Sequence, residues 1–474
     1  MKRVHVLSSG HVARSTGNGT GNEKREFVLR SLILVLFLIP FTCGTVFGQA
    51  VDPGPRGGTI DAGQPIAGLS ADQQRFFTNA VSQFTEIQNV TDASPGNGGL
   101  GPVFNSNSCG SCHSQPATGG TSPSTSAFPF VGPNPQVAVA TLDGASNKIP
   151  FFVTVDGPVR EARFIRQPNG QPDGGVHDLF TIAGRSDAPG CTLAQPNFEQ
   201  AQDEHNLIFR IPTSLFGVGL IENLSQATLM NNLNATAQAR RRLGIGGTFN
   251  TSGNDGTIMK LGWKAQNKSG LIFAGEAYNV EIGVTNEAFT NERGDPPASC
   301  LFNATPEDTT IPGPVGADPD QSLSDIQDFE IVMRFLDQAT PGPSSQSTQN
   351  GFVMFQQVGC ALCHSPSMTT SASFVSGLSN VQANLFSDLA IHHMGENLED
   401  GVTQGSAGPD QFRTAPLWGI GQRVFFLHDG RTSDLLQAIQ AHASRGSEAN
   451  AVIRNFNGLT TTQQQDVLNF LRSL

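Results

Sequence analysis

Two short copies of one cysteine pattern contain the residues best suited to chemistry. They are Cys109-Gly-Ser-Cys112-His113 and Cys360-Ala-Leu-Cys363-His364. C-x-x-C-H is the attachment signature of c-type haem, in which two thiols reach one porphyrin edge and the adjacent histidine ligates iron. A redox dithiol needs neither the histidine nor a second copy, and a zinc site would leave the histidines redundant. The pattern predicts two covalently bound haems with His113 and His364 as axial ligands.

The residue on the far side of each iron decides between electron transfer and catalysis, because two strong axial ligands exclude peroxide. Met394 follows His392 and His393 in a polar segment and precedes Gly395, which allows the backbone to approach a ring. Met394 is the predicted sixth ligand of the second haem. For the first haem no methionine stands out, and His177 is as typical of a surface loop as of a ligand. The sixth position of the first haem is left open, as a peroxidase requires.

The first 50 residues are typical of an export signal. Residues 28–47 form an apolar run preceded by Lys24 and Arg25, and Gly48-Gln49-Ala50 supplies the small residues of a cleavage site. We expect cleavage after Ala50 and a periplasmic protein, because c-type haem is attached outside the cytoplasm. The alternative is a retained segment that ties the protein to the membrane. After cleavage no stable membrane insertion is expected.

The remaining cysteines of the exported chain, Cys191 and Cys300, have no short spacing and no neighbouring histidine. The oxidising environment of exported proteins favours disulfides. The sequence therefore predicts a Cys191–Cys300 disulfide that closes a long loop and takes no part in catalysis. Free thiols are the alternative.

Composition narrows the class of partner. The 474 residues include 28 basic and 40 acidic side chains, a net charge of −12, which excludes a basic nucleic-acid-binding protein. With 53 glycines, 29 prolines and a 37% apolar fraction, we expect a folded chain that is rich in loops. An acidic surface favours a basic partner, such as a small cytochrome that donates or accepts electrons.

Amphipathic patterns predict a helix on each side of both motifs. Ser70 is placed to cap a helix with four apolar side chains on one face before the first motif. A second apolar stripe covers 322–337, residues 351–359 lead directly into the second motif, and 460–474 form a closing helix. Helix, motif and closing helix are the parts of a small cytochrome c domain, so the chain is predicted to contain two.

A long region separates the first motif from its closing helix, and alternating patterns at 137–141 and 151–155 predict strands there. The predicted fold class is mainly α, with a β-rich insertion at about 120–320 that covers the first haem. The expected organisation is a signal peptide (1–50), a flexible segment (51–69), an N-terminal haem domain (70–339), a linker (340–348) and a C-terminal haem domain (349–474).

Short blocks in a defined order surround the two motifs. They are Gly99-Leu-Gly-Pro-Val-Phe-Asn105, Phe216-Gly-Val-Gly-Leu-Ile-Glu222, Gly262-Trp-Lys-Ala-Gln266, Ser387 to Gly395, Phe412 to Gly419, and Leu427-His-Asp-Gly-Arg431 with Ala438, Ile439 and His442. In these blocks the chain resembles a bacterial di-haem oxidoreductase family of peroxidase-like or thiol-oxidoreductase-like proteins, related to di-haem cytochrome c peroxidases and the methylamine-utilisation di-haem enzyme. One departure is His393, where the family usually has Asp. Which of His392, His393 and Met394 meets iron therefore stays open.

The resemblance implies that one haem, expected to be the first, reacts with peroxide while the other relays electrons. It implies Glu222 as the catalytic carboxylate, since peroxide cleavage needs an acid or base near the distal oxygen. His428 and Arg431 are expected to bind haem propionates, and Trp418 to relay electrons between the haems. Two alternatives remain, a non-catalytic di-haem electron-transfer protein with both irons saturated, and an oxidase of a protein or thiol substrate.

Overall fold

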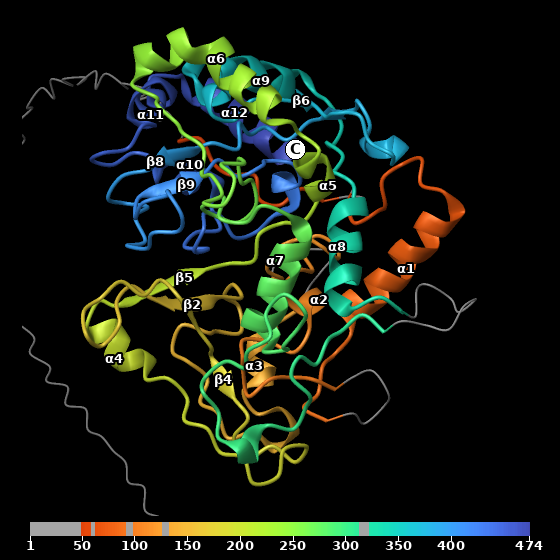
Figure 1. Cartoon of the computed structure of the whole chain (residues 1–474). Coiled ribbons are helices and arrows are strands. Elements are labelled where there is room, and N and C mark those ends of the chain that lie inside the picture. Colours follow the sequence, from red (N-terminus) through yellow and green to blue (C-terminus); the bar gives the residue numbers. More distant parts are fainter. Residues whose placement is uncertain (1–48, 58–61, 92–97, 126–131, 312–321) are drawn as a thin grey trace, which may run out of the picture. The chain divides into compact units, whose positions relative to one another are not determined.

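The computed structural model describes residues 49–57, 62–91, 98–125, 132–311 and 322–474 (Figure 1). The predicted signal peptide lies outside the described residues except for Gln49 and Ala50. Within the described ranges, no helix has both the length and the apolar character needed to cross a bilayer.

Helices dominate the described residues, and the strands are short (Figure 1). The α-helices are α1 (Ala71–Thr85), α2 (Cys109–Cys112), α3 (Pro135–Val139), α4 (Phe198–Asp203), α5 (Val218–Glu222), α6 (Gln226–Leu243), α7 (Gly270–Ala277), α8 (Asp325–Phe335), α9 (Gln346–Val358), α10 (Leu435–Gln440), α11 (Asn450–Asn457) and α12 (Thr461–Ser473). The strands are β1 (Val103–Phe104), β2 (Glu161–Phe164), β3 (Val176–His177), β4 (Phe180–Thr181), β5 (Leu207–Arg210), β6 (Met368–Thr369), β7 (Gln382–Ala383), β8 (Ile391–His393) and β9 (Gln411–Arg413). Two short turns also position functional groups, the π-helical turn η2 (Tyr278–Ile282) and the 3₁₀ turn η5 (Cys360–Leu362).

Helices α1 and α8 pack against each other beside the first cysteine motif. Ser70 begins α1 with a capping box, and Phe77, Ala80 and Phe84 are the buried residues of this helix. The ring of Phe84 meets that of Phe329 in α8 edge to face, with centroids 6.0 Å apart. Both helices predicted around the first motif are confirmed, the second over a shorter range.

Helices α9 and α12 form a similar pair beside the second motif. Gly351 of α9 faces the carbonyl of Asp466 in α12, where any added Cβ atom would collide with the backbone. Capping boxes at Ser345 and Thr460 begin the two helices. Because Ser345 caps α9, this helix begins within the range 340–348 that the sequence predicts as a linker.

The region 120–320 is not β-rich. Its described part contains five α-helices and four short strands, and the largest sheet has the antiparallel order β3-β2-β5. The predicted strand at 137–141 is wrong, because Pro135 and the capping side chain of Asn134 begin helix α3 there. The second predicted strand, 151–155, is also wrong and consists of turns and irregular structure.

The segment 51–69, predicted to be flexible, is anchored in its described part. Asp52 forms a buried ion pair with Arg472 of α12 at 2.6 Å. The Ile66 N–H donates to the carbonyl oxygen of Phe335 at 2.8 Å. These two contacts hold the described part of the segment against α12 and α8.

The predicted disulfide is confirmed. Cys191 and Cys300 are bonded, and both are buried in the core of the 120–320 region.

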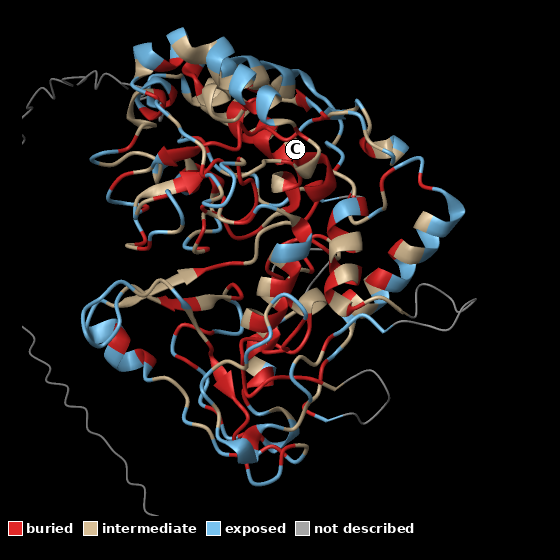
Figure 2. Ribbon diagram, in the orientation of Figure 1, coloured by how far each residue is buried: buried red, intermediate tan, exposed pale blue. Residues whose placement is uncertain are grey.

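Figure 2 shows that the buried residues of the paired helices lie on the sides that face neighbouring elements. The core therefore forms where these elements meet, next to the two cysteine motifs.

Candidate functional site

Both cysteine motifs fold as a single helical turn. The His113 N–H donates to the carbonyl of Cys109 at 3.0 Å, and the His364 N–H donates to that of Cys360 at 2.9 Å. Gly359 ends α9 directly before the second turn with a φ of 105°, a conformation that favours glycine. The four motif thiols form no disulfide.

The two motif histidines are held in the same way. Nδ1 of His113 lies 3.0 Å from the Gly120 carbonyl oxygen, and Nδ1 of His364 lies 2.9 Å from that of Phe386. A carbonyl only accepts, so each Nδ1–H donates and each Nε2 keeps its lone pair. Burial lowers the pKa of both imidazoles to about 4, which keeps them neutral at physiological pH. Both rings are thus suited to ligate a metal.

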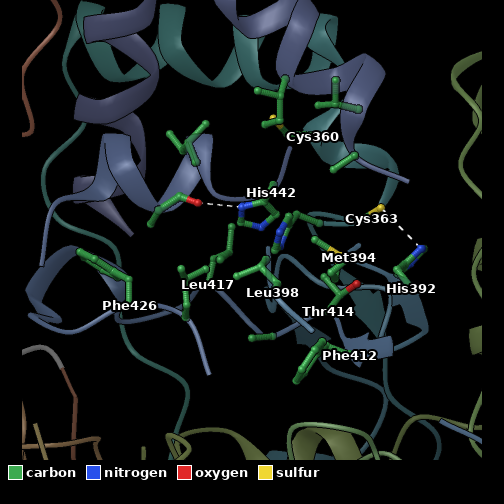
Figure 3. Close-up of a pocket in the computed structure, with 18 of the residues that line it drawn as sticks. Cys360, Cys363, His392, Met394, Leu398, Phe412, Thr414, Leu417, Phe426 and His442 are labelled. Atoms are coloured by element: carbon green, nitrogen blue, oxygen red, sulfur yellow. Dashed lines mark hydrogen bonds between the residues drawn. The ribbon is translucent and has the colours of Figure 1, made fainter. Parts of the chain in front are cut away.

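A cavity of about 220 Å³, here called the second cavity, lies beside the second motif (Figure 3). Its wall includes Cys360, Cys363, His364, His392, Met394, His428 and His442. These residues come from four separate stretches of the chain, so the cavity forms only when the C-terminal part of the chain is folded.

Of the three candidate ligands left open by the sequence, geometry favours Met394. His392 has no free ring nitrogen, because Nδ1 binds Glu448 at 2.6 Å and Nε2 binds Asp388 at 3.1 Å. The His393 side chain is half exposed and absent from the wall of the second cavity. Met394 is part of that wall.

His442 offers a second possible ligand atom. Its Nδ1 lies 2.8 Å from the Ala438 carbonyl oxygen, which fixes the proton there and leaves Nε2 free. Burial lowers the pKa of His442, so the ring is neutral. The sequence placed His442 in one of the blocks that carry the family resemblance. Nothing in that block indicated that His442 lines the same cavity as His364.

The predicted propionate ligands separate in the structure. His428 lines the second cavity, where its ring stacks on that of Phe412 at 4.3 Å. Arg431 does not line it, because its guanidinium binds the Asp429 carboxylate at 2.7 Å and the Asn397 carbonyl. The structure does not bring Arg431 to the site predicted for it.

Two other arginines lie at the second cavity, where Arg431 was predicted. Arg413 and Arg423 line the second cavity, and burial lowers the pKa of each to about 10. Nη1 of Arg413 and Nη2 of Arg423 have no hydrogen-bond partner among the described residues. Buried cations with unpaired donors fit the carboxylates of a haem. The sequence does not single them out, because an isolated arginine is usually a surface charge.

A cavity of about 160 Å³, here called the first cavity, lies beside the first motif. Strand β2 turns Glu161 and Arg163 to the same face of the sheet, because side chains two residues apart point the same way. The register pairs Glu161 with Arg210 of β5, and all three side chains line the first cavity. Nε of Arg210 has no partner among the described residues, so this cavity also offers an unpaired cationic donor.

A pair of carboxyl groups faces this cavity. Arg163 Nε donates to Glu161 at 2.6 Å, and Asn105 Nδ2 donates to Glu281 of η2 at 2.9 Å. Burial and the Glu161 charge raise the pKa of Glu281 well above its ordinary value. Burial also opposes ionisation of Glu161, but Arg163, Arg210 and a hydrogen bond with Glu281 together outweigh it and lower the Glu161 pKa. The pair therefore presents one protonated and one ionised carboxyl group.

Glu222, the predicted catalytic carboxylate, does not line the first cavity. Its carboxylate accepts the Gly270 N–H at 2.6 Å at the start of α7 and lies 3.6 Å from Arg334. His177 is also absent from the wall and stacks on Phe164 with ring centroids 3.7 Å apart. The structure does not bring Glu222 to the site predicted for it, because a negative charge is held at the N-terminus of α7 instead.

Trp263, rather than Trp418, lies between the cavities. The Trp263 indole lines both, and its Nε1–H donates to the Ile211 carbonyl at 2.9 Å. Trp418 lines neither and packs against Gly217. The tryptophan that lines both cavities is therefore Trp263 of the block 262–266, and not Trp418.

Two matched thiol and imidazole sites, each on a cavity with unpaired cationic donors, define a haem-type site geometry. A family profile described as "Di-haem oxidoreductase, putative peroxidase" matches residues 166–474. The match covers more than half of the chain, so the chain belongs to the di-haem oxidoreductase family. It includes the second cysteine motif and begins after the first.

Two solved structures show a distant similarity. One is hydrazine synthase of Kuenenia stuttgartiensis, at 20% identity over 32% of this chain and 55% of that chain, with a TM-score of 0.22. The other is a MauG-like protein associated with microbial copper homeostasis, at 15% identity over 56% of this chain and 90% of that chain, with a TM-score of 0.29. The chain thus spans about half the length of the hydrazine synthase chain. No curated protein sequence matches it.

Proposed function

We propose that this protein is an exported, periplasmic di-haem c-type cytochrome that reduces hydrogen peroxide with electrons from a small donor protein. The observation that carries the proposal is the difference between two sites with matched histidines. The first cavity contains the paired Glu161 and Glu281 carboxyl groups as well as Met333, whereas the second contains Met394 and one carboxylate, Glu448, which binds His392. One site is suited to proton transfer and the other to electron transfer.

The chain's own residues would hold two haems. Cys109 and Cys112, and likewise Cys360 and Cys363, would form the thioether links, and Nε2 of each motif histidine would ligate iron. Arg413 and Arg423 would bind propionates in the second cavity. When bound, a haem whose sixth position is open supplies a redox-active iron to which peroxide can bind.

In the first cavity, Glu161 is placed to act as general base and acid. Its carboxylate takes a proton from peroxide and returns it to the departing oxygen, while Arg163 keeps Glu161 ionised between turnovers. The balanced reaction combines one H₂O₂ with two protons and two electrons to form two waters. The electrons come from the donor protein. The two protons come from solvent, so Arg163 and Arg210 stay charged.

The second site would receive those electrons. Met394 would be the second axial ligand of a haem bound there and would exclude peroxide from its iron, and Trp263 lines both cavities. After removal of residues 1–50 the chain retains 22 basic and 38 acidic residues, which favours a basic donor such as a small cytochrome. Nucleic acid is not an expected partner.

The decisive experiment compares purified wild type, Glu161→Gln and Glu222→Gln. Wild type is expected to reduce peroxide, and Glu161→Gln to lose about 100-fold in kcat because general acid and base catalysis is removed. Glu222→Gln should retain the wild-type rate. If both irons are six-coordinate and inert to peroxide in the oxidised and half-reduced protein, the enzyme proposal is lost and an electron-transfer protein remains.

A further inference from the structure

The chain contains a single tyrosine, and it lines the first cavity. Tyr278 is 2% exposed and shares the cavity wall with Cys109 and His113. It is the first residue of the π-helical turn η2, which also carries Glu281 to this wall. Such turns are rare and often occur at functional sites. The peroxide chemistry proposed above does not use this phenol.

The phenol has a buried proton acceptor. Tyr278 Oη donates to the Asp325 carboxylate at 2.7 Å. Asp325 begins α8, and the Asp308 carboxylate accepts the backbone N–H groups of Asp325 and Ile326 at 2.7 and 3.2 Å. Neither carboxylate forms an ion pair within the described part of the chain. Burial raises the pKa of Asp325, and that of Asp308 to about 7, so both carboxylates readily accept a proton.

The packing holds the ring in place and shields it from bulk solvent. Phe329 of α8 meets the Tyr278 ring edge to face, with centroids 5.0 Å apart at 90°. A phenol in water loses its proton to solvent on oxidation, whereas here Asp325 is the direct acceptor. A residue needed only for packing could be phenylalanine at this position, because the oxygen contributes only its bond to Asp325.

We propose that Tyr278 is a redox-active tyrosine that gives one electron to the peroxide-oxidised first haem and its phenolic proton to Asp325. The inference rests on the proposed function. The phenol O–H bond breaks, an O–H bond forms on the Asp325 carboxylate, and a neutral phenoxyl radical remains. An electron from the donor protein and the proton on Asp325 later restore the phenol. One oxidising equivalent of peroxide is thereby held on the protein when the second haem cannot supply an electron.

The test is electron paramagnetic resonance of the oxidised holoprotein frozen after mixing with peroxide. Protein grown with ring-deuterated tyrosine carries the label only at position 278, so the hyperfine structure of the radical should narrow. Tyr278→Phe should remove the signal. Asp325→Asn should lower its yield about tenfold or more because the base is lost, and Asp325→Glu should restore most of it. A signal that deuteration leaves unchanged, or that persists undiminished in Tyr278→Phe or Asp325→Asn, overturns the proposal.

Two controls separate this inference from the proposed function. Circular dichroism shows that each variant folds, covalent haem content measured by mass shows that it is loaded, and the optical response of the haems to peroxide reports the proposed function alone. If that response is absent, the same samples are oxidised by a flash-generated ruthenium(III) polypyridine complex. A tyrosyl radical that depends on Asp325 then still supports the inference, and its absence contradicts it.

Discussion

At the scale of residues, two matched imidazoles lie beside cavities with different walls. His113 and His364 are oriented by backbone carbonyls in the same way and are both neutral. The wall of the first cavity contributes Glu161, and that of the second contributes Met394 and His442. The proposed function rests on this difference between the two cavity walls.

Replacing Met394 by alanine should open the second iron. We expect loss of the sulfur-to-iron charge-transfer absorption and conversion of that haem to a high-spin state, because the thioether is removed. Absorption and paramagnetic resonance spectra of the oxidised protein measure both changes. Met230→Ala, at an exposed methionine of α6, is the matched control. A spectrum unchanged in Met394→Ala and altered in His442→Ala would instead identify His442 as the ligand.

At the scale of elements, each cysteine motif depends on a pair of crossing helices. Gly351 lets α9 approach the α12 backbone, and Gly359 turns the end of α9 into the second motif. Helix caps at Ser345 and Thr460 set where the two helices begin. The position of Cys360 thus depends on a helix contact made nine residues earlier in the chain.

A methyl group at this crossing should destabilise the protein. Gly351→Ala would place a Cβ atom against the Asp466 carbonyl oxygen, and relieving that overlap should lower the free energy of unfolding by about 1 to 3 kcal/mol. Chemical denaturation monitored by circular dichroism measures the change. Gly253→Ala, at a glycine whose Cβ would meet open space, should be neutral. Equal effects of the two substitutions would contradict the close helix contact.

At the scale of the whole molecule, distant parts of the chain meet around the cavities. Arg210 of the first cavity binds Asp400 at 2.6 Å, and Lys264 binds the same carboxylate at 3.0 Å. The Lys264 ammonium lies 4.1 Å from the ring centroid of Phe412, which lines the second cavity. These buried charges connect the two walls. At the other end, Asp52 joins the first described residues to α12.

The Asp52 link should make stability depend on pH. Burial opposes ionisation of Asp52, but hydrogen bonds from Arg472 and the Leu435 N–H outweigh it and lower the pKa below the ordinary 3.8. A lowered folded pKa contributes stability above about pH 4, which is lost as the pH falls through the folded value. Asp52→Asn should therefore cost about 2 kcal/mol at neutral pH, and the difference from wild type should shrink below pH 4. Urea denaturation at several pH values measures it.

An exposed pair provides the control for this link. Asp255→Asn removes a partner of Lys268 at the surface and should leave stability unchanged at every pH. A constant difference between wild type and Asp52→Asn down to the lowest pH would show that the effect comes from packing rather than from the charge of Asp52.

Local features were predictable from the sequence because neighbouring residues determine them. The C-x-x-C-H spacing forms its turn within five residues, and capping residues such as Ser70 and Thr460 begin helices within one turn. Cys191 and Cys300 were the cysteines left over for a disulfide once the two motifs and the predicted signal peptide were set aside. The alternation of apolar and polar residues at 137–141 predicted a strand that does not form. Pro135 and the capping Asn134 begin a helix there instead.

The walls of the cavities were decided only by the tertiary structure. Glu161 in a short strand and Glu281 in a π-helical turn are 120 residues apart, and each alone is an ordinary acidic residue. The same holds for three residues that line the second cavity, Trp263, Arg413 and Arg423. Only their position in the cavity wall distinguishes them from other tryptophans and arginines. The sequence by itself determined the two C-x-x-C-H turns and the histidine that each turn carries. Folding decided which groups meet across each cavity. Whether a side chain is buried, and which side chain it faces, depends on contacts between segments that are far apart in the sequence.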